Sequence, residues 1–118
     1  MEKDFTFEEF LENVCLRPQM WVPNGSFNNV FSLIMGYTIG NKATPLSGEN
    51  WRNFNRYGCI KFGFPTNVVV SYVFKKCSKN DEDAINLFHE TVNEFISLPK
   101  MTADEIIDHA SKTFNQKN

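Results

Sequence analysis

The segment PTNVVVSYVFKKC, residues 65–77, decides the fold class because it fits two periodicities. Its β-branched content favours a strand, whose single face would carry Val68, Val70, Tyr72 and Phe74. A helix would instead use Thr66 as its N-cap after Pro65, and its apolar stripe would be Val69, Val70, Val73, Phe74 and Cys77. No second convincing strand exists to pair with it, and one strand alone cannot satisfy its backbone hydrogen bonds. We therefore expect a helix, with a strand at residues 66–77 as the alternative that would make the fold α+β.

The first and last helices are predicted by the same start signal. Thr6 with Glu9, and Thr102 with Glu105, have the spacing of a capping box. A hydrophobic staple is expected around each box, from Phe5 with Phe10 and from Met101 with Ile106. The apolar stripes that follow are Phe7, Phe10, Leu11 and Val14 in the first helix, and Ile106, Ile107, Ala110 and Phe114 in the last. We expect Pro18 to end the first helix.

A second helix is expected from Ser26, as its N-cap, to Gly40. Its inward residues would be Phe27, Val30, Phe31, Ile34 and Met35. Gly36 lies inside this pattern, where a glycine often marks the close approach of a neighbouring helix.

Two more helices complete the prediction. Ser47 would cap a helix that carries Trp51, Phe54 and Tyr57 and ends at Gly58 or Gly63. The segment SKNDED then gives an acidic first turn, which suits a helix dipole, and Pro99 ends that helix. Its stripe would be Ala84, Leu87, Phe88, Val92, Phe95 and Ile96. The sequence therefore predicts an all-α, compact bundle of five or six helices in one domain over residues 1–118.

Composition limits the classes of function. The 118 residues carry a formal net charge of −2, which argues against a nucleic-acid binder and is compatible with a basic protein partner. Twelve phenylalanines predict a strongly aromatic core. Cys15, Cys59 and Cys77 are widely spaced and odd in number, which is typical of buried, reduced thiols rather than of a disulfide framework. No apolar signal core or membrane-spanning segment is evident, so we expect a cytoplasmic protein.

Motifs for catalysis and metal binding are incomplete. HETVN, residues 89–93, lacks the second histidine of a zinc-protease motif. DEDAINLFHETV, residues 81–92, begins like a calcium loop but lacks its glycine and its closing glutamate. A Cys–His pair could still meet in space, although the three cysteines lie at or beside apolar stripes, which favours core packing. We expect a protein that is not an enzyme and has no catalytic, metal-ligating or cofactor-binding residues.

Four segments together resemble a family of small bacterial proteins. They are CLRPQMW, LIMGYTIG, NWRNFNRYG and EDAINLFHETVNEFI. The pattern is similar to the immunity proteins encoded beside polymorphic or contact-dependent growth-inhibition toxins. The family's loop of the form Arg-Pro-x-Met-aromatic is matched by Arg17, Pro18, Met20 and Trp21, with Gln19 where glycine is frequent. Its segment of the form acidic–Ala–x–x–Leu/Phe–Phe is matched by Asp83, Ala84, Leu87 and Phe88. The resemblance covers most of residues 5–98.

The resemblance implies a protein that binds its cognate toxin C-terminal domain and blocks it. Many such toxins are nucleases with basic surfaces, so an acidic inhibitor face is physically sensible. The candidate acidic residues are Glu2, Asp4, Glu8, Glu9 and Glu12 in the first segment, and Asp81, Glu82, Asp83, Glu90 and Glu94 in the fifth helix. For any single one of them, an ordinary solvated position is the alternative. We expect no nucleic acid or membrane partner, and a monomer.

The loop LRPQMWVPNGS, residues 16–26, has two interpretations. In the first, Arg17 caps or pairs at a helix end while Met20 and Trp21 pack down as a lid over the core. In the second, Arg17 and Trp21 contact the partner directly, since Trp, Met and Arg are enriched at interface centres. The alternative functions are a small regulatory adaptor, or a phage-encoded inhibitor, acting on another basic protein. An enzyme with a Cys–His site is a third class that no motif supports.

Overall fold

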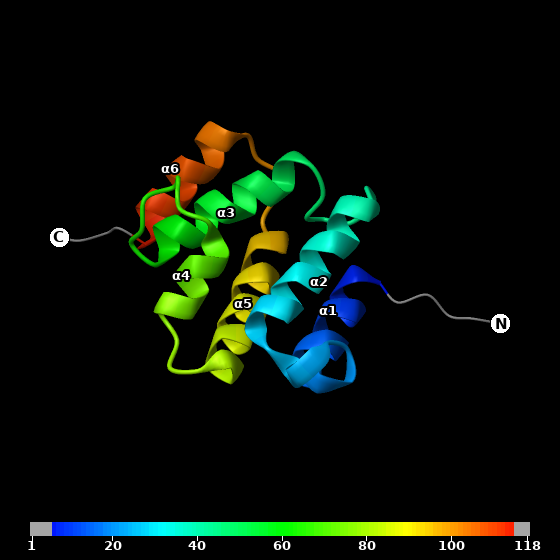
Figure 1. Ribbon diagram of the computed structural model, residues 1–118. Coiled ribbons are helices and arrows are strands. Elements are labelled where there is room, and N and C mark those ends of the chain that lie inside the picture. Colours follow the sequence, from blue (N-terminus) through cyan, green and yellow to red (C-terminus); the bar gives the residue numbers. More distant parts are fainter. Residues whose placement is uncertain (1–5, 115–118) are drawn as a thin grey trace.

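A computed structural model describes residues 6–114 and contains six α-helices in that range, with no strand (Figure 1). The helices are α1 (Phe7–Leu16), α2 (Phe27–Gly40), α3 (Glu49–Lys61), α4 (Val70–Lys76), α5 (Asp81–Ile96) and α6 (Ala103–Phe114). Two short 3-10 turns, η1 (Pro18–Met20) and η2 (Pro23–Gly25), connect α1 to α2. The predicted all-α bundle is confirmed. None of the helices found in residues 6–114 is both long and apolar enough to cross a bilayer.

The ambiguous segment at residues 65–77 forms the short helix α4, but it begins later than predicted. Val69, not Thr66, is the N-cap. The cause lies in α3, where the Asn55 side chain donates to the Val68 carbonyl (2.9 Å) and accepts from the Val70 N–H (2.8 Å). This amide holds Val69 in an extended conformation after the turn at residues 65–68, so the helix begins at Val70. The predicted stripe is therefore wrong at both ends, because Val69 and Cys77 are exposed while Val70, Val73 and Phe74 are buried.

The predicted capping signals are confirmed at three helices. Thr6 with Glu9, and Thr102 with Glu105, form reciprocal capping boxes, and the Ser26 hydroxyl accepts from the Asn29 N–H. Glu2, Asp4 and Phe5 lie outside the described residues, so the staple predicted between Phe5 and Phe10 stays a prediction.

The predicted N-cap of α3 is wrong. Gly48, at φ +61°, takes that position, because the Ser47 hydroxyl donates instead to the carbonyls of Lys42 and Thr44 in the preceding turn. The helix then ends at Lys61, between the two glycines predicted to stop it.

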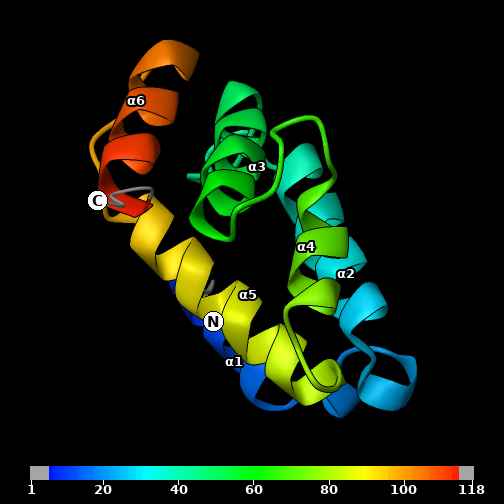
Figure 2. The same ribbon diagram turned by 90° about the vertical axis from the view of Figure 1, so that its left-hand side faces the viewer.

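The core is built on α5, which lies between α1 on one side and α3 and α4 on the other (Figure 2). Phe54 of α3, Phe74 of α4 and Phe88 of α5 are fully buried and contact one another, with ring centroids 5.6–6.2 Å apart. Phe27, the first residue of α2, joins this cluster through Phe74 and Phe88. The phenylalanine-rich composition is therefore used to join four helices at one point.

The close helix approach expected at Gly36 is found elsewhere. A Cβ at Gly36 would meet no atom within 4 Å, so the prediction there is wrong. A Cβ at Gly58 would lie 2.5 Å from Val70 Cγ2, which is buried in α4. Gly58 thus allows α3 and α4 to pack closely.

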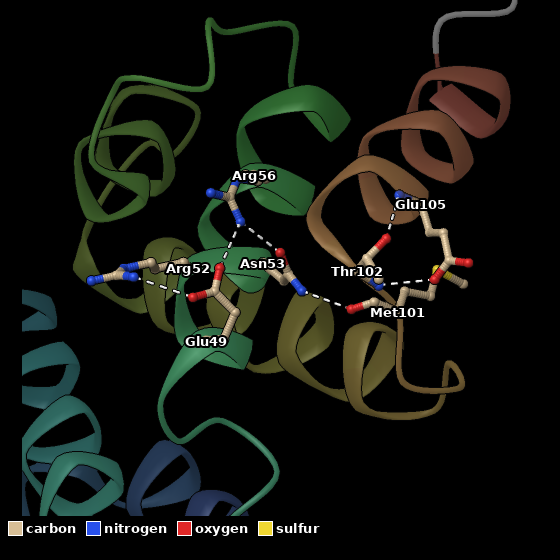
Figure 3. Close-up of polar contacts among 7 residues, drawn as sticks. All are labelled: Glu49, Arg52, Asn53, Arg56, Met101, Thr102 and Glu105. Carbon is tan, nitrogen blue, oxygen red and sulfur yellow. Dashed lines mark hydrogen bonds and ion pairs between the residues drawn. The ribbon is translucent and has the colours of Figure 1, made fainter.

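Helix α6 is attached to α3 by a polar connection and an aromatic one. The buried Asn53 amide donates to the Met101 carbonyl (3.0 Å) and accepts from Arg56 (2.6 Å), next to the Thr102–Glu105 capping box (Figure 3). At the other end of α6, Phe114 packs edge-on against Tyr57. Ile106 and Ala110 are buried as predicted, whereas Ile107 is 36% exposed, which corrects that part of the stripe.

The three cysteines do not share one environment. Cys15 and Cys59 are buried, as expected, and Cys77 is exposed at the end of α4. The expectation of three buried thiols is therefore wrong for Cys77, because α4 ends before that residue can turn toward the core.

Candidate protein-binding face

The loop between α1 and α2 is folded tightly on itself. The Met20 N–H donates to the Arg17 carbonyl (3.0 Å) and the Trp21 N–H to the Pro18 carbonyl (2.9 Å). Asn24 and Gly25 both have a positive φ, and a Cβ at Gly25 would lie 3.1 Å from the backbone nitrogen of Gln19. The second turn is therefore stacked against the first, which gives the loop a defined surface.

That surface exposes large apolar side chains. Leu16 is 67% exposed, Met20 71% and Trp21 40%. Trp21 packs edge-on against Phe10, with ring centroids 5.5 Å apart, whereas Val22 is the loop residue that enters the core. The lid interpretation is wrong for Met20 and holds for only part of the Trp21 ring.

Arg17 ends α1 through its backbone, because its N–H donates to the Asn13 carbonyl (3.2 Å). Its side chain is exposed and makes no ion pair within residues 6–114. The capping role expected of Arg17 therefore belongs to the main chain, and its guanidinium group extends from the loop toward solvent.

Helices α1 and α5 lie side by side and run in opposite directions (Figure 2). The end of α1, at Cys15, lies near the start of α5, while Glu12 lies close enough to His89 for its charge to act on the imidazole. Burial lowers the pKa of His89, and the carboxylates of Glu12 and Glu90 oppose that shift. Glu12 of α1 and Glu90 of α5 therefore lie near the same imidazole, whereas Glu94 faces α3 and Asp81 faces α2 and α4.

Four of the candidate acidic residues have structural roles. Glu9 belongs to the first capping box. Asp81 accepts from the Phe27 N–H (3.1 Å) and from Lys75 (3.1 Å), and these two bonds lower its pKa. Asp83 accepts from the Lys79 N–H, and Glu94 pairs with Lys61 (2.6 Å) and accepts from the Tyr57 hydroxyl. These four carboxylates therefore already have hydrogen-bond or ion-pair partners within the protein.

The other four candidates, Glu8, Glu12, Glu82 and Glu90, are exposed. Within residues 6–114 they form no ion pair and accept no side-chain hydrogen bond. Each can therefore meet a partner's cation without first breaking an internal contact.

A groove of about 520 Å³ lies where the end of α1, the loop and the first turns of α5 meet. Its floor includes Cys15 and Ile85, which are 6% and 2% exposed. Its polar lining is Gln19, Asn24, Glu82 and Asn86. Among residues 6–114, no histidine, lysine or arginine lines it.

The Cys15 thiol at the floor of the groove is held in its protonated form. Burial raises the pKa of the Cys15 thiol to about 12, which disfavours the thiolate that a nucleophile needs. The described part of the chain also brings together no group of three or more His, Cys, Asp or Glu residues able to hold a metal ion.

Comparison with known proteins finds no match, whether to a protein-family model, to a curated protein or to a solved structure.

Sequence reasoning missed several residues of this face. Leu16, predicted in the loop, is the last residue of α1, and the sequence pattern assigns no binding role to Gln19, Asn24, Ile85 or Asn86. The Asn24–Gly25 pair did signal a turn, but the groove depends on how that turn packs against α5, which no local pattern specifies.

Proposed function

We propose that this protein is an immunity protein that binds a cognate toxin domain with a basic surface and neutralises it stoichiometrically in the cytoplasm. One observation carries the proposal: the exposed Leu16 and the carboxylate of Glu82 line one groove, Met20 and Trp21 are exposed on the loop beside it, and Glu12 and Glu90, on the two helices that border it, form no ion pair within residues 6–114. The resemblance of residues 5–98 to immunity proteins supplies the kind of partner. We call this surface the α1–α5 face.

The two kinds of side chain have different tasks in such a complex. Tryptophan and methionine are enriched at interface centres, where their burial supplies much of the binding free energy. Carboxylates speed the encounter with a basic partner and suppress acidic ones. A nuclease domain, which must attract a polyanion, presents the complementary charge.

Co-expression with the toxin gene expected directly upstream, followed by growth measurement and co-purification, tests this proposal. We expect growth rescue and a one-to-one complex whose association rate falls as salt is raised, because ions screen the acidic face. Lack of both rescue and complex would refute the immunity function and leave an adaptor or phage-encoded inhibitor of another basic protein as the explanation.

A matched pair of variants locates the binding surface. Met20→Ser removes an apolar side chain that is 71% exposed on the α1–α5 face, and Ile39→Ser removes one that is 68% exposed at the end of α2. We expect the first to weaken binding at least tenfold, or about 1.4 kcal/mol, and the second to leave affinity unchanged. Equal effects would place the interface elsewhere.

A further inference from the structure

We propose that the groove at the start of α5 receives one arginine side chain of the partner, an inference that rests on the proposed function. The aliphatic part of the arginine would lie against Leu16 and Pro18, above the buried Cys15 and Ile85, and its guanidinium group would reach the Glu82 carboxylate. The groove would then be the specificity pocket of the α1–α5 face.

The floor fits the stem of such a side chain. Cys15 and Ile85 are almost completely buried at the bottom of the groove, so the apolar surface that a ligand would meet belongs mainly to Leu16 and Pro18, which line the same groove. Long cationic side chains commonly lay their methylene groups on apolar surface and keep the charged end at a polar rim. The thiol stays neutral, because burial raises the pKa of Cys15, and it adds no charge to the floor.

The rim fits the head group. Glu82 is exposed and unpaired within the described chain, and Gln19, Asn24 and Asn86 add amide groups with no side-chain hydrogen bond to other described residues. A guanidinium group presents five N–H donors in one plane, which suits a carboxylate surrounded by amide oxygens. The cation nearest to Glu82 in the chain, Lys79, forms no ion pair with it within residues 6–114, and the next one, Lys76, forms none either.

Other occupants fit less well. An apolar side chain would strip water from Glu82 and three amides without replacing their hydrogen bonds, which is costly. An acidic side chain would be repelled by Glu82. Lysine carries the right charge but is more strongly hydrated and cannot make the planar, bidentate contact.

The groove can be tested without the toxin by NMR titration with N-acetyl-arginine methylamide. The matched control probe is N-acetyl-citrulline methylamide, which has nearly the same shape and no charge. A third probe, N-acetyl-lysine methylamide, carries the same charge as arginine without its planar head group. We expect saturable shifts at the amides of Gly25, Ile85 and Asn86 with arginine, and at least tenfold weaker binding of citrulline. Equal binding of arginine and citrulline, or no shift at these amides, would overturn the proposal.

Two variants assign the effect to the carboxylate. Glu82→Gln should reduce arginine binding at least tenfold, while Asp104→Asn, at an exposed carboxylate in the first turn of α6, should not change it. Equal loss in both variants would mean that the arginine responds only to net charge, which would also overturn the proposal.

The complex separates this inference from the proposed function. If the toxin domain binds Glu82→Gln as tightly as the native protein, the arginine pocket is refuted while the immunity function stands. If no toxin domain binds although arginine titrates into the groove, the immunity function is refuted while the pocket stands. We expect the toxin domain to bind Glu82→Gln at least tenfold more weakly.

Discussion

The aromatic core and the loop after α1 use similar residues in opposite ways. Phe54, Phe74 and Phe88 are fully buried, whereas Met20 and Trp21 are 71% and 40% exposed. The difference lies in the backbone: the three phenylalanines point inward from packed helices, while two consecutive 3-10 turns direct the loop side chains outward. An apolar residue therefore contributes to stability or to binding according to the local geometry that presents it, and substitutions can measure that division.

The largest loss of stability is expected in the core. Phe54→Ala would leave a cavity beside Phe74, Phe88 and Phe95, and we expect the free energy of unfolding to fall by about 3–5 kcal/mol. Urea denaturation measures this change. A loss below about 1 kcal/mol would show that the core does not depend on this contact, and the contrast with the loop would fail.

The next largest effect on stability compares two helical glycines that have different surroundings. Gly58→Ala places a methyl group against the buried Val70, and we expect it to cost about 1–3 kcal/mol. Gly36→Ala meets no neighbour inside α2 and should stabilise by about 0.5–1 kcal/mol, because alanine loses less conformational entropy in a helix. Thermal unfolding of both variants gives the comparison, and equal shifts would contradict the close approach of α3 and α4.

Neighbouring carboxylates at the start of α5 give a smaller contrast. Asp81→Ala removes the acceptor for the Phe27 N–H and should cost about 1 kcal/mol, while Glu82→Ala should stay within about 0.5 kcal/mol. The folded-state pKa of Asp81 is lowered by that bond and by Lys75, so its contribution is complete above about pH 5 and is lost as the pH falls below about 4. When the free energy of unfolding is measured against pH, its decrease in acid should therefore be smaller in Asp81→Ala than in the native protein and unchanged in Glu82→Ala.

The smallest stability effects are expected in the loop. Trp21→Ala should cost about 1 kcal/mol through its edge-on contact with Phe10, and Met20→Ser should change stability by less than about 0.5 kcal/mol. Calorimetry of the two variants checks this order. A large loss for Met20→Ser would restore the lid interpretation and break the comparison with the core.

Local signals in the sequence were enough for the helical fold. The two capping boxes, the Ser26 N-cap and the apolar stripe of α5 each depend on residues within a few positions of one another. The start of α4 could not be predicted in this way, because it is fixed by Asn55, which lies 15 residues before Val70. Gly58 is predicted only as a possible helix end, because its role in close packing depends on Val70 across a helix pair.

The candidate site was predictable only in part. The acidic segments and the loop are predicted from composition and resemblance, and the structure places the loop beside Glu82 of α5 and places Glu12 and Glu90 near the same histidine. Which carboxylates are free was not predictable, since Asp81 is bonded to Phe27 and Lys75 and Glu94 to Lys61 and Tyr57, and all of these except Lys75 are distant in the chain. Their partners depend on tertiary packing rather than on spacing.

The single exposed thiol at the end of α4 has a practical consequence. Cys15 and Cys59 are shielded, so a maleimide fluorophore would attach to Cys77 without any engineered cysteine. Only three residues separate this position from Asp81, the first residue of α5, where the loop and the groove converge. A dye placed there would change its emission when another molecule docks nearby, which gives an optical assay with the wild-type sequence.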